Sequence, residues 1–149
     1  MQKLCIFGQR IAMTKHEIVL MSITGEDKPG VTSSLTEILS KHNATILDIG
    51  QANIHQSLSL GILFRLDPVM QGNILKDLLF KSYELGVQAK FTPIEREDYD
   101  QWVSRQGKES YVITVLGQKI EANQLAHVTK VIAEQGLNID TIKRLTGRI

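Results

Sequence analysis

The stretch I-T-G-E-D-K-P-G-V-T-S-S-L-T-E-I-L, Ile23–Leu39, takes the chain from an apolar strand through a charged turn into a helix. The strand is the β-branched run E-I-V-L-M-S-I-T-G, which ends at a glycine. Pro29 stands where the first turn of a helix accepts proline. Apolar residues then follow at helical spacing: Val31, Leu35, Ile38 and Leu39. The pattern predicts strand, turn and helix, and leaves open whether the turn binds a ligand or only redirects the chain.

The residues after this helix predict three more strands and one more helix. The expected strands lie at 44–54, 57–66 and 87–93, and the expected helix lies at 69–85. Gly50 marks a bulge or a close backbone approach in the second strand, and Gly86 closes the second helix. The order βαββαβ over residues 17–94 is that of a ferredoxin-like α+β domain, with two helices over one face of a four-stranded antiparallel sheet.

The pattern then restarts after a charged segment. Residues 95–108, E-R-E-D-Y-D-Q-W-V-S-R-Q-G-K, predict a linker with a short helix held by Trp102. The run E-S-Y-V-I-T-V-L-G, Glu109–Gly117, matches Glu17–Gly25 at a constant separation of 92 positions. Beyond the following loop the separation becomes 93, which indicates one inserted residue. The chain therefore contains a repeated supersecondary unit.

The second copy, residues 109–149, contains only a strand, a helix and a strand. Half of this fold leaves a sheet edge and an apolar face uncovered, which compact proteins avoid. We therefore expect either that the chain belongs to a longer protein or that a partner chain covers this half. Residues 1–16 fit neither copy and are interpreted as an N-terminal extension.

Composition and charge exclude several classes of function. The chain has 149 residues, is 42% hydrophobic and carries a formal net charge of +1, so it lacks the basic excess that nucleic acids or anionic membranes attract. Cys5 is the only cysteine, which excludes an intrachain disulfide. No apolar run approaches the roughly 18 to 20 residues of a membrane helix. We expect a soluble, cytoplasmic protein that binds neither nucleic acid nor membrane.

No catalytic or metal site is expected in this chain. The four histidines lie on different predicted elements without metal-ligand spacing, and one cysteine cannot complete a structural zinc site. Asp98 and Asp100 flank a tyrosine and superficially match the D-x-D motif of phosphatases, but a solvated linker is the better interpretation. The sequence also lacks a P-loop, a G-x-S-x-G elbow and the aromatic strand positions with which RNA-recognition domains stack bases.

The turn around Gly30 favours a small-molecule site. A helix N-terminus offers unpaired N–H groups to a carboxylate, and glycine lets a ligand approach the backbone. Asp27 can accept hydrogen bonds from an ammonium group or cap the helix. Asp48, Gly50 and Gln51 lie on the strand that we expect to neighbour the first strand, where they would border the turn. These groups suit a small zwitterion, while a capped turn without a ligand is the simpler alternative.

The whole arrangement resembles tandem ACT domains, the small-molecule regulatory modules of amino-acid metabolism. The quoted stretch with I-L-D-I-G-Q behind it, and V-L-G-Q-K-I with G-L-N-I-D-T-I-K-R-L-T-G-R-I, are similar to the N-terminal regulatory region of bacterial phosphoserine phosphatases over residues 17–149. The resemblance implies a cytosolic parent enzyme of serine biosynthesis. Its catalytic domain, of the haloacid-dehalogenase type, would lie C-terminal to the ACT pair and use Mg²⁺ to hydrolyse O-phosphoserine. That domain is absent here, so no cofactor is expected in this chain.

The resemblance also implies an amino-acid site, with L-serine as the expected ligand, and a homodimer formed through the ACT domains. Carried to this sequence, the site comprises Asp27, Pro29, Gly30, Val31, Asp48, Ile49, Gly50 and Gln51. Asn123 matches Gly30 in the second copy; it can cap the helix but fills space that glycine leaves open, so we do not expect equivalent binding there. A stand-alone ACT protein that acts through protein contacts and a dimerisation module without a ligand are the alternatives.

Overall fold

The computed structural model describes residues 18–66, 71–107 and 109–145. The chain divides into two compact units, Met1–Lys108 and Glu109–Ile149, and each is described by itself. The first unit contains β1 (Ile18–Glu26), α2 (Val31–Lys41), β2 (Thr45–Ile54), β3 (Ser57–Arg65), α3 (Gln71–Glu84), β4 (Gln88–Ile94) and α4 (Arg96–Arg105), and the second contains α5 (Ala122–Glu134). The predicted βαββαβ order is confirmed. The proposed N-terminal extension, with Cys5 and His16, and the predicted helix start at Val69 lie outside the described residues.

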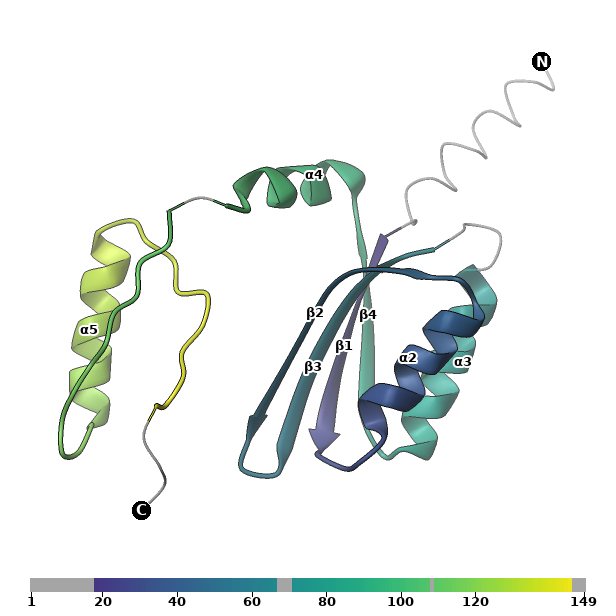
Figure 1. The fold of residues 1–149 in the computed structure, drawn as a ribbon, viewed down its shortest axis with the longest axis horizontal. Coiled ribbons are helices and arrows are strands. Elements are labelled where there is room, and N and C mark those ends of the chain that lie inside the picture. Colours follow the sequence, from purple (N-terminus) through teal and green to yellow (C-terminus); the bar gives the residue numbers. More distant parts are fainter. Residues whose placement is uncertain (1–17, 67–70, 108, 146–149) are drawn as a thin grey trace. The chain divides into compact units, whose positions relative to one another are not determined.

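The sheet of the first unit is antiparallel, with the strand order β2-β3-β1-β4. Figure 1 shows α2 and α3 together on one face of it, as a ferredoxin-like α+β fold requires. The order corrects one expectation, because β3 lies between β1 and β2 and the second strand does not neighbour the first. Each of the two strand-helix-strand connections therefore skips one strand position.

The core lies between the sheet and these two helices. Side chains on alternate positions of the two central strands point under the helices and pair across the ladder as Val19–Phe64, Met21–Ile62 and Ile23–Leu60, all buried. Helix α2 contributes Val31, Leu35 and Leu39 at helical spacing. Burial of such a side chain stabilises the fold by about 1.5 to 3 kcal/mol. Val31, the first residue of α2, is part of this core, so the turn before it is anchored at its helical end.

A bulge in β2 decides which of its side chains face the helices. The register shifts between Ile46 and Asp48, so the bulge is not at Gly50, which pairs regularly with Gly61. An inserted residue reverses the faces of all later positions on a strand. Ile46 pairs with buried Phe64 before the bulge, whereas Asp48 pairs with Leu63 on the open face after it.

The ends of the helices follow the expected chemistry, with one exception. Gly86 adopts φ 71° directly after α3, and its N–H donates to the carbonyl of Tyr83, so the predicted C-terminal closure is confirmed. Helix α2 ends at Lys41, as expected from the polar residues that follow. Pro29 is the exception, because it precedes the N-cap Gly30 and therefore lies outside the first helical turn.

The second unit contains the predicted helix but no strand ladder in its described part. Figure 1 shows the two segments that flank α5 as extended coil. The strand order of the first unit gives the reason. The equivalents of β1 and β2 would be separated by a strand of the β3 type, and the described residues of this unit include none. Without that strand, neither segment has a hydrogen-bonding neighbour.

The described residues contain no cluster of three or more His, Cys, Asp or Glu side chains that would hold a metal ion. Of the helices that the structure describes, none combines the length and apolar character needed to cross a bilayer. Asp98 and Asp100 lie on the exposed surface of α4, where Tyr99 and Trp102 pack with their ring centroids 5.8 Å apart.

Candidate functional site

The turn from β1 to α2 is built around a left-handed glycine. Gly30 has φ 92°, a conformation that L side chains rarely adopt, and it is the N-cap residue of α2. Space does not impose the glycine, because a Cβ built there would meet only the Ser33 Oγ at 3.9 Å. Pro29 and Asp27 are exposed on the same turn. Backbone conformation, rather than crowding, therefore accounts for Gly30.

No side chain caps the N-terminus of α2. The Ser33 hydroxyl donates to the carbonyl of Gly30 over 3.1 Å. The N–H of Val31 lies 3.5 Å from the carbonyl of Lys28, at the limit of a hydrogen bond. The start of α2 thus keeps N–H groups and a positive dipole end available to an anion.

Asp27 is held by β2 and the β2-β3 turn, and it does not cap the helix. Its carboxylate accepts a hydrogen bond of 2.6 Å from the side-chain amide of Asn53. Its backbone N–H donates to the carbonyl of Gln56 over 2.8 Å. The carboxylate is exposed, so it is positioned and still accessible to a ligand.

A second contact joins β2 to the first turn of α2. The Thr32 hydroxyl donates to Oε1 of Gln51 over 2.8 Å. Gln51 pairs with Leu60 and Asn53 pairs with Leu58, both buried under the helices, so these two polar side chains share the helix-facing side of β2. The bulge earlier in the strand is what turns them toward α2.

The structure brings some of the expected residues together and separates others. Asp27, Gly30 and Gln51 surround the start of α2, while Val31 is buried in the core beneath it. Asp48 and Gly50 lie on the opposite face of β2, and the Asp48 carboxylate accepts a 2.9 Å bond from the N–H of Ile49.

Ile49 pairs with the buried Ile62 and so faces the helix side of the sheet. Thr32 and Asn53 were not among the expected residues. The sequence does carry a signal for Asn53, because strand alternation places it on the same face as Gln51.

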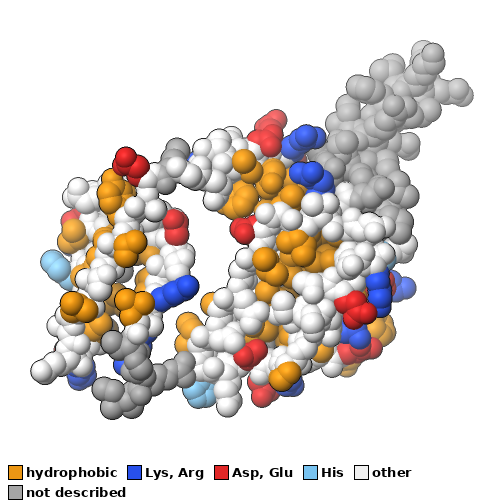
Figure 2. All heavy atoms as spheres, in the orientation of Figure 1, with side chains coloured by type: hydrophobic (Ala, Val, Ile, Leu, Met, Phe, Trp, Pro, Cys, Tyr) orange, Lys and Arg blue, Asp and Glu red, His pale blue; other side chains and the backbone are white. Residues whose placement is uncertain are grey.

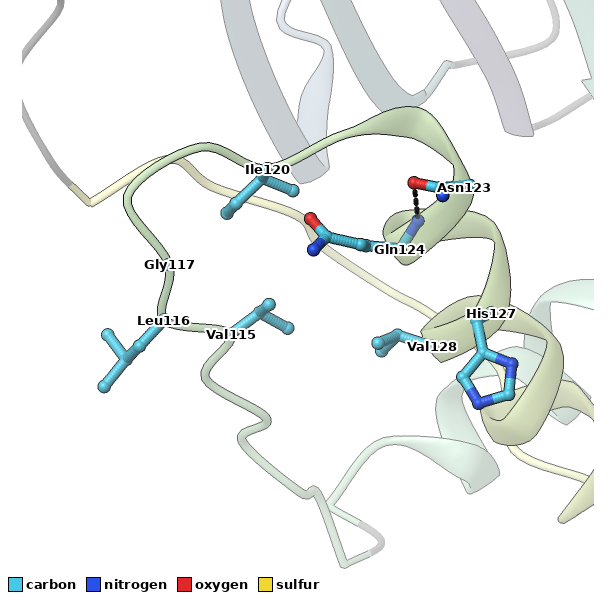
Figure 3. A pocket seen from close by; sticks show the side chains of 8 residues that line it. All are labelled: Val115, Leu116, Gly117, Ile120, Asn123, Gln124, His127 and Val128. Atoms are coloured by element: carbon cyan, nitrogen blue, oxygen red, sulfur yellow. Dashed lines mark hydrogen bonds between the residues drawn. The ribbon is translucent and has the colours of Figure 1, made fainter.

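The matching turn in the second unit is closed by its own side chains. Glu121 is the N-cap of α5 and forms a reciprocal capping box with Gln124, whose side-chain oxygen lies 3.0 Å from the Glu121 nitrogen. Asn123, one residue inside the start of α5, accepts a 2.8 Å bond from the N–H of Gln124 (Figure 3). Asn123 therefore satisfies one N–H of the first turn, as expected of a capping side chain, although Glu121 holds the N-cap position.

An open pocket of about 410 Å³ lies beside this second turn. Its lining is mainly apolar, and Figure 3 shows Val115 and Val128 pointing toward each other across it. Asn123, Gln124 and His127 contribute polar groups to the lining, and the side-chain oxygens of Asn123 and Gln124 already accept hydrogen bonds at the helix start. The second turn therefore offers apolar volume, whereas the first offers available backbone N–H groups and an acid.

Comparisons with known proteins agree with the tandem arrangement. One model of the ACT domain matches residues 17–92, and a second ACT-domain model matches residues 109–147. The chain is 37% identical over 131 residues to phosphoserine phosphatase SerB2 of Mycobacterium tuberculosis, covering 86% of this chain and 31% of that protein. It is 27% identical over 128 residues to the phosphoserine phosphatase of Streptomyces coelicolor, covering 85% of this chain and 30% of that protein.

A much smaller relative matches as well. The chain is 30% identical over 70 residues to the UPF0237 protein MK1213 of Methanopyrus kandleri, covering 46% of this chain and 78% of that protein. The chain thus spans about a third of the length of the two phosphatases and most of the length of the small archaeal protein.

Proposed function

This chain belongs to the ACT-domain family, and from that membership we propose that it is the amino-acid-sensing region of a phosphoserine phosphatase, with L-serine as its ligand. The parent enzyme would hydrolyse O-phosphoserine in the cytoplasm with a Mg²⁺-dependent domain outside this sequence. The present chain would need no cofactor and would act as a homodimer. Its similarity to about a third of the length of two phosphoserine phosphatases supports the assignment.

The observation that carries the proposal is the open start of α2 next to a held carboxylate. The α-carboxylate of an amino acid would accept hydrogen bonds from the N–H groups of Thr32 and Ser33. Its ammonium group would donate to Asp27, and the serine hydroxyl would exchange a hydrogen bond with Gln51. Gly30 would leave the approach to the backbone clear.

Ligand binding at the start of α2 would affect the sheet through hydrogen bonds that already join the turn to it. Asp27 bonds to Asn53 and Thr32 bonds to Gln51, so the turn is connected to β2 at two points. A third bond, from the Asp27 N–H to the carbonyl of Gln56, connects it to the β2-β3 turn. A zwitterion that competes for Asp27 and Gln51 would change the attachment of the exposed edge strand β2. Such differential contacts are what a regulatory ligand requires.

Titration calorimetry with L-serine, glycine and O-phosphoserine tests the proposal. We expect L-serine to bind, and Asp27→Asn to weaken it by about tenfold or more, because a charged hydrogen bond to the ammonium group is lost. Asp48→Asn is the matched control, since it makes the same change on the opposite face of β2 and should leave the affinity unaltered. An equal loss of L-serine affinity in both variants would count against a site at this turn. The absence of binding heat from every amino acid with the wild-type chain would count against it as well.

The small archaeal relative supports a second candidate, a stand-alone ACT protein that regulates through protein contacts. The two proposals differ in the gene that encodes the chain. A downstream D-x-D-x-[ST] motif on a predicted strand, together with serine-sensitive phosphatase activity of the full product, would favour the first. A stop codon after Ile149 would favour the second.

A further inference from the structure

Polar side chains of β2 face the first turn of α2 at an open place on the surface. Gln51 and Asn53 are exposed, and Thr32 is half-buried. Figure 2 shows acidic and basic side chains at this end of the first unit, at the bottom of the view, where Figure 1 places the turn from β1 to α2. An amino-acid side chain bound here would meet polar groups and water, so hydrogen bonds would decide which side chain is accepted.

The bond between Thr32 and Gln51 decides which half of the Gln51 amide is left for a ligand. A threonine hydroxyl has one hydrogen to donate, and that of Thr32 goes to Oε1 of Gln51 over 2.8 Å. The two N–H groups of the amide take no part in this bond. The hydroxyl of Thr36, one turn further along α2, donates to the backbone carbonyls of Thr32 and Ser33 instead. Gln51 therefore faces a ligand as a hydrogen-bond donor.

The next side chain on the same face of β2 presents the opposite kind of group. The amide nitrogen of Asn53 donates to the Asp27 carboxylate over 2.6 Å, and its carbonyl oxygen takes no part in that bond. Acceptor oxygens therefore gather around Asp27, where the ammonium group of an amino acid would donate. The donor at Gln51 is complementary to an oxygen on the side chain of the ligand.

We propose that Gln51 selects the side chain of the ligand, that Thr32 orients Gln51 for this task, and that the accepted ligands are small amino acids with an oxygen at the γ position. The inference rests on the amino-acid site proposed above and adds what that site distinguishes. Alanine lacks the oxygen and leaves the Gln51 amide to water. Because the contact is exposed, the oxygen should contribute about three- to tenfold in affinity, as one net hydrogen bond does in water.

Titration calorimetry of the 149-residue chain with L-serine, L-alanine and O-methyl-L-serine tests the selectivity. The ether oxygen of O-methyl-L-serine accepts a hydrogen bond but cannot donate one. Both oxygen-bearing ligands should therefore bind about three- to tenfold more tightly than L-alanine. Equal affinity for L-serine and L-alanine would refute the selectivity and leave amino-acid binding intact, whereas no binding of any of the three would refute the proposed function and this inference together.

Gln51→Glu tests the direction of the hydrogen bond. A carboxylate at this position can only accept, so L-serine would have to donate its hydroxyl hydrogen and O-methyl-L-serine would lose its partner. The preference for O-methyl-L-serine over L-alanine should disappear, while L-serine should still bind more tightly than L-alanine. Comparing ligands within one variant cancels the effect of the added charge on their common α-carboxylate. An unchanged preference for O-methyl-L-serine would overturn the role of Gln51.

Thr32→Val tests the positioning role, with Thr36→Val as the matched control. Without the Thr32 hydroxyl, the Gln51 amide can turn either its oxygen or its nitrogen toward the ligand. The preference for O-methyl-L-serine over L-alanine should fall at least twofold, whereas L-serine, which both accepts and donates, should keep its preference. Thr36→Val removes the same hydroxyl one turn away from Gln51 and should change neither preference. The same response in both valine variants would refute the role of Thr32.

Discussion

The two copies of the strand-turn-helix unit differ in opposite ways at two places, the apolar core and the start of the helix. In the first copy the core is closed, with Leu39 buried, and the start of the helix has no side-chain cap. In the second copy the start of the helix is closed by Glu121 and Gln124, and the apolar face stays open. The comparison teaches that a helix start can remain available for a ligand when packing elsewhere stabilises the helix, since isolated short helices depend on such packing.

The largest effect is expected from the difference between the two cores. Leu39 and Ile132 occupy equivalent helix positions, and only Leu39 is fully buried. Leu39→Ala should lower the free energy of unfolding of the first unit by about 2 to 5 kcal/mol, because it loses buried area and leaves a cavity. Ile132→Ala should cost less than about 1.5 kcal/mol in the second unit. Hydrogen exchange of each unit measures both.

Comparable losses in the two units would show that the second unit has a closed core of its own, and the inversion would fail. A small effect of Leu39→Ala would equally contradict the comparison. Leu39 is so well packed in the first unit that its truncation should also speed hydrogen exchange at the start of α2, about two turns away along the same helix.

A smaller loss of stability is expected from a substitution in the turn before α2. Gly30→Ala places a Cβ on a residue with φ 92°, which should cost about 1 to 2 kcal/mol of stability. Gly50→Ala is the control, because Gly50 lies in a regular strand with no atom within 4 Å of its missing Cβ and has no positive φ. Urea denaturation followed by circular dichroism should resolve the two. If Gly50→Ala is as damaging as Gly30→Ala, the cost is not one of left-handed backbone conformation.

Much of the fold of the first unit was predictable from sequence because its causes are local. The alternation in β1 and β3, the helix stripe that contains Leu35 and the closing Gly86 all follow from spacing or backbone chemistry, and all agree with the structure. The repeat at 92 positions also identified which residues to compare.

The remaining features depend on contacts between distant residues. The bulge after Ile46 reverses the faces of β2, so Asp48 was expected at the turn and lies on the other side of the sheet. The bond from Asn53 of β2 to Asp27 of the turn after β1 joins residues 26 positions apart, and local spacing gives no sign of it. The described part of the second unit lacks a ladder for the same reason, since a strand forms only where a neighbouring strand supplies hydrogen bonds.

The smallest change in stability should come from adding a capping side chain to the uncapped turn before α2. Gly30→Asn keeps a residue type that tolerates positive φ and adds a side chain that can cap α2. The lost conformational freedom and the gained cap should nearly offset each other, so the free energy of unfolding should change by less than about 1 kcal/mol.

The same substitution should weaken L-serine binding by about tenfold, or about 1.4 kcal/mol, because the new side chain occupies the N–H groups that a carboxylate would use. Calorimetry and urea denaturation on one sample separate the two effects. Unchanged affinity in a stable Gly30→Asn protein would mean that the open start of α2 is not the binding surface. The asparagine variant is a sharper test than Gly30→Ala, because it adds a capping side chain at the N-cap of α2 without the backbone strain that alanine imposes.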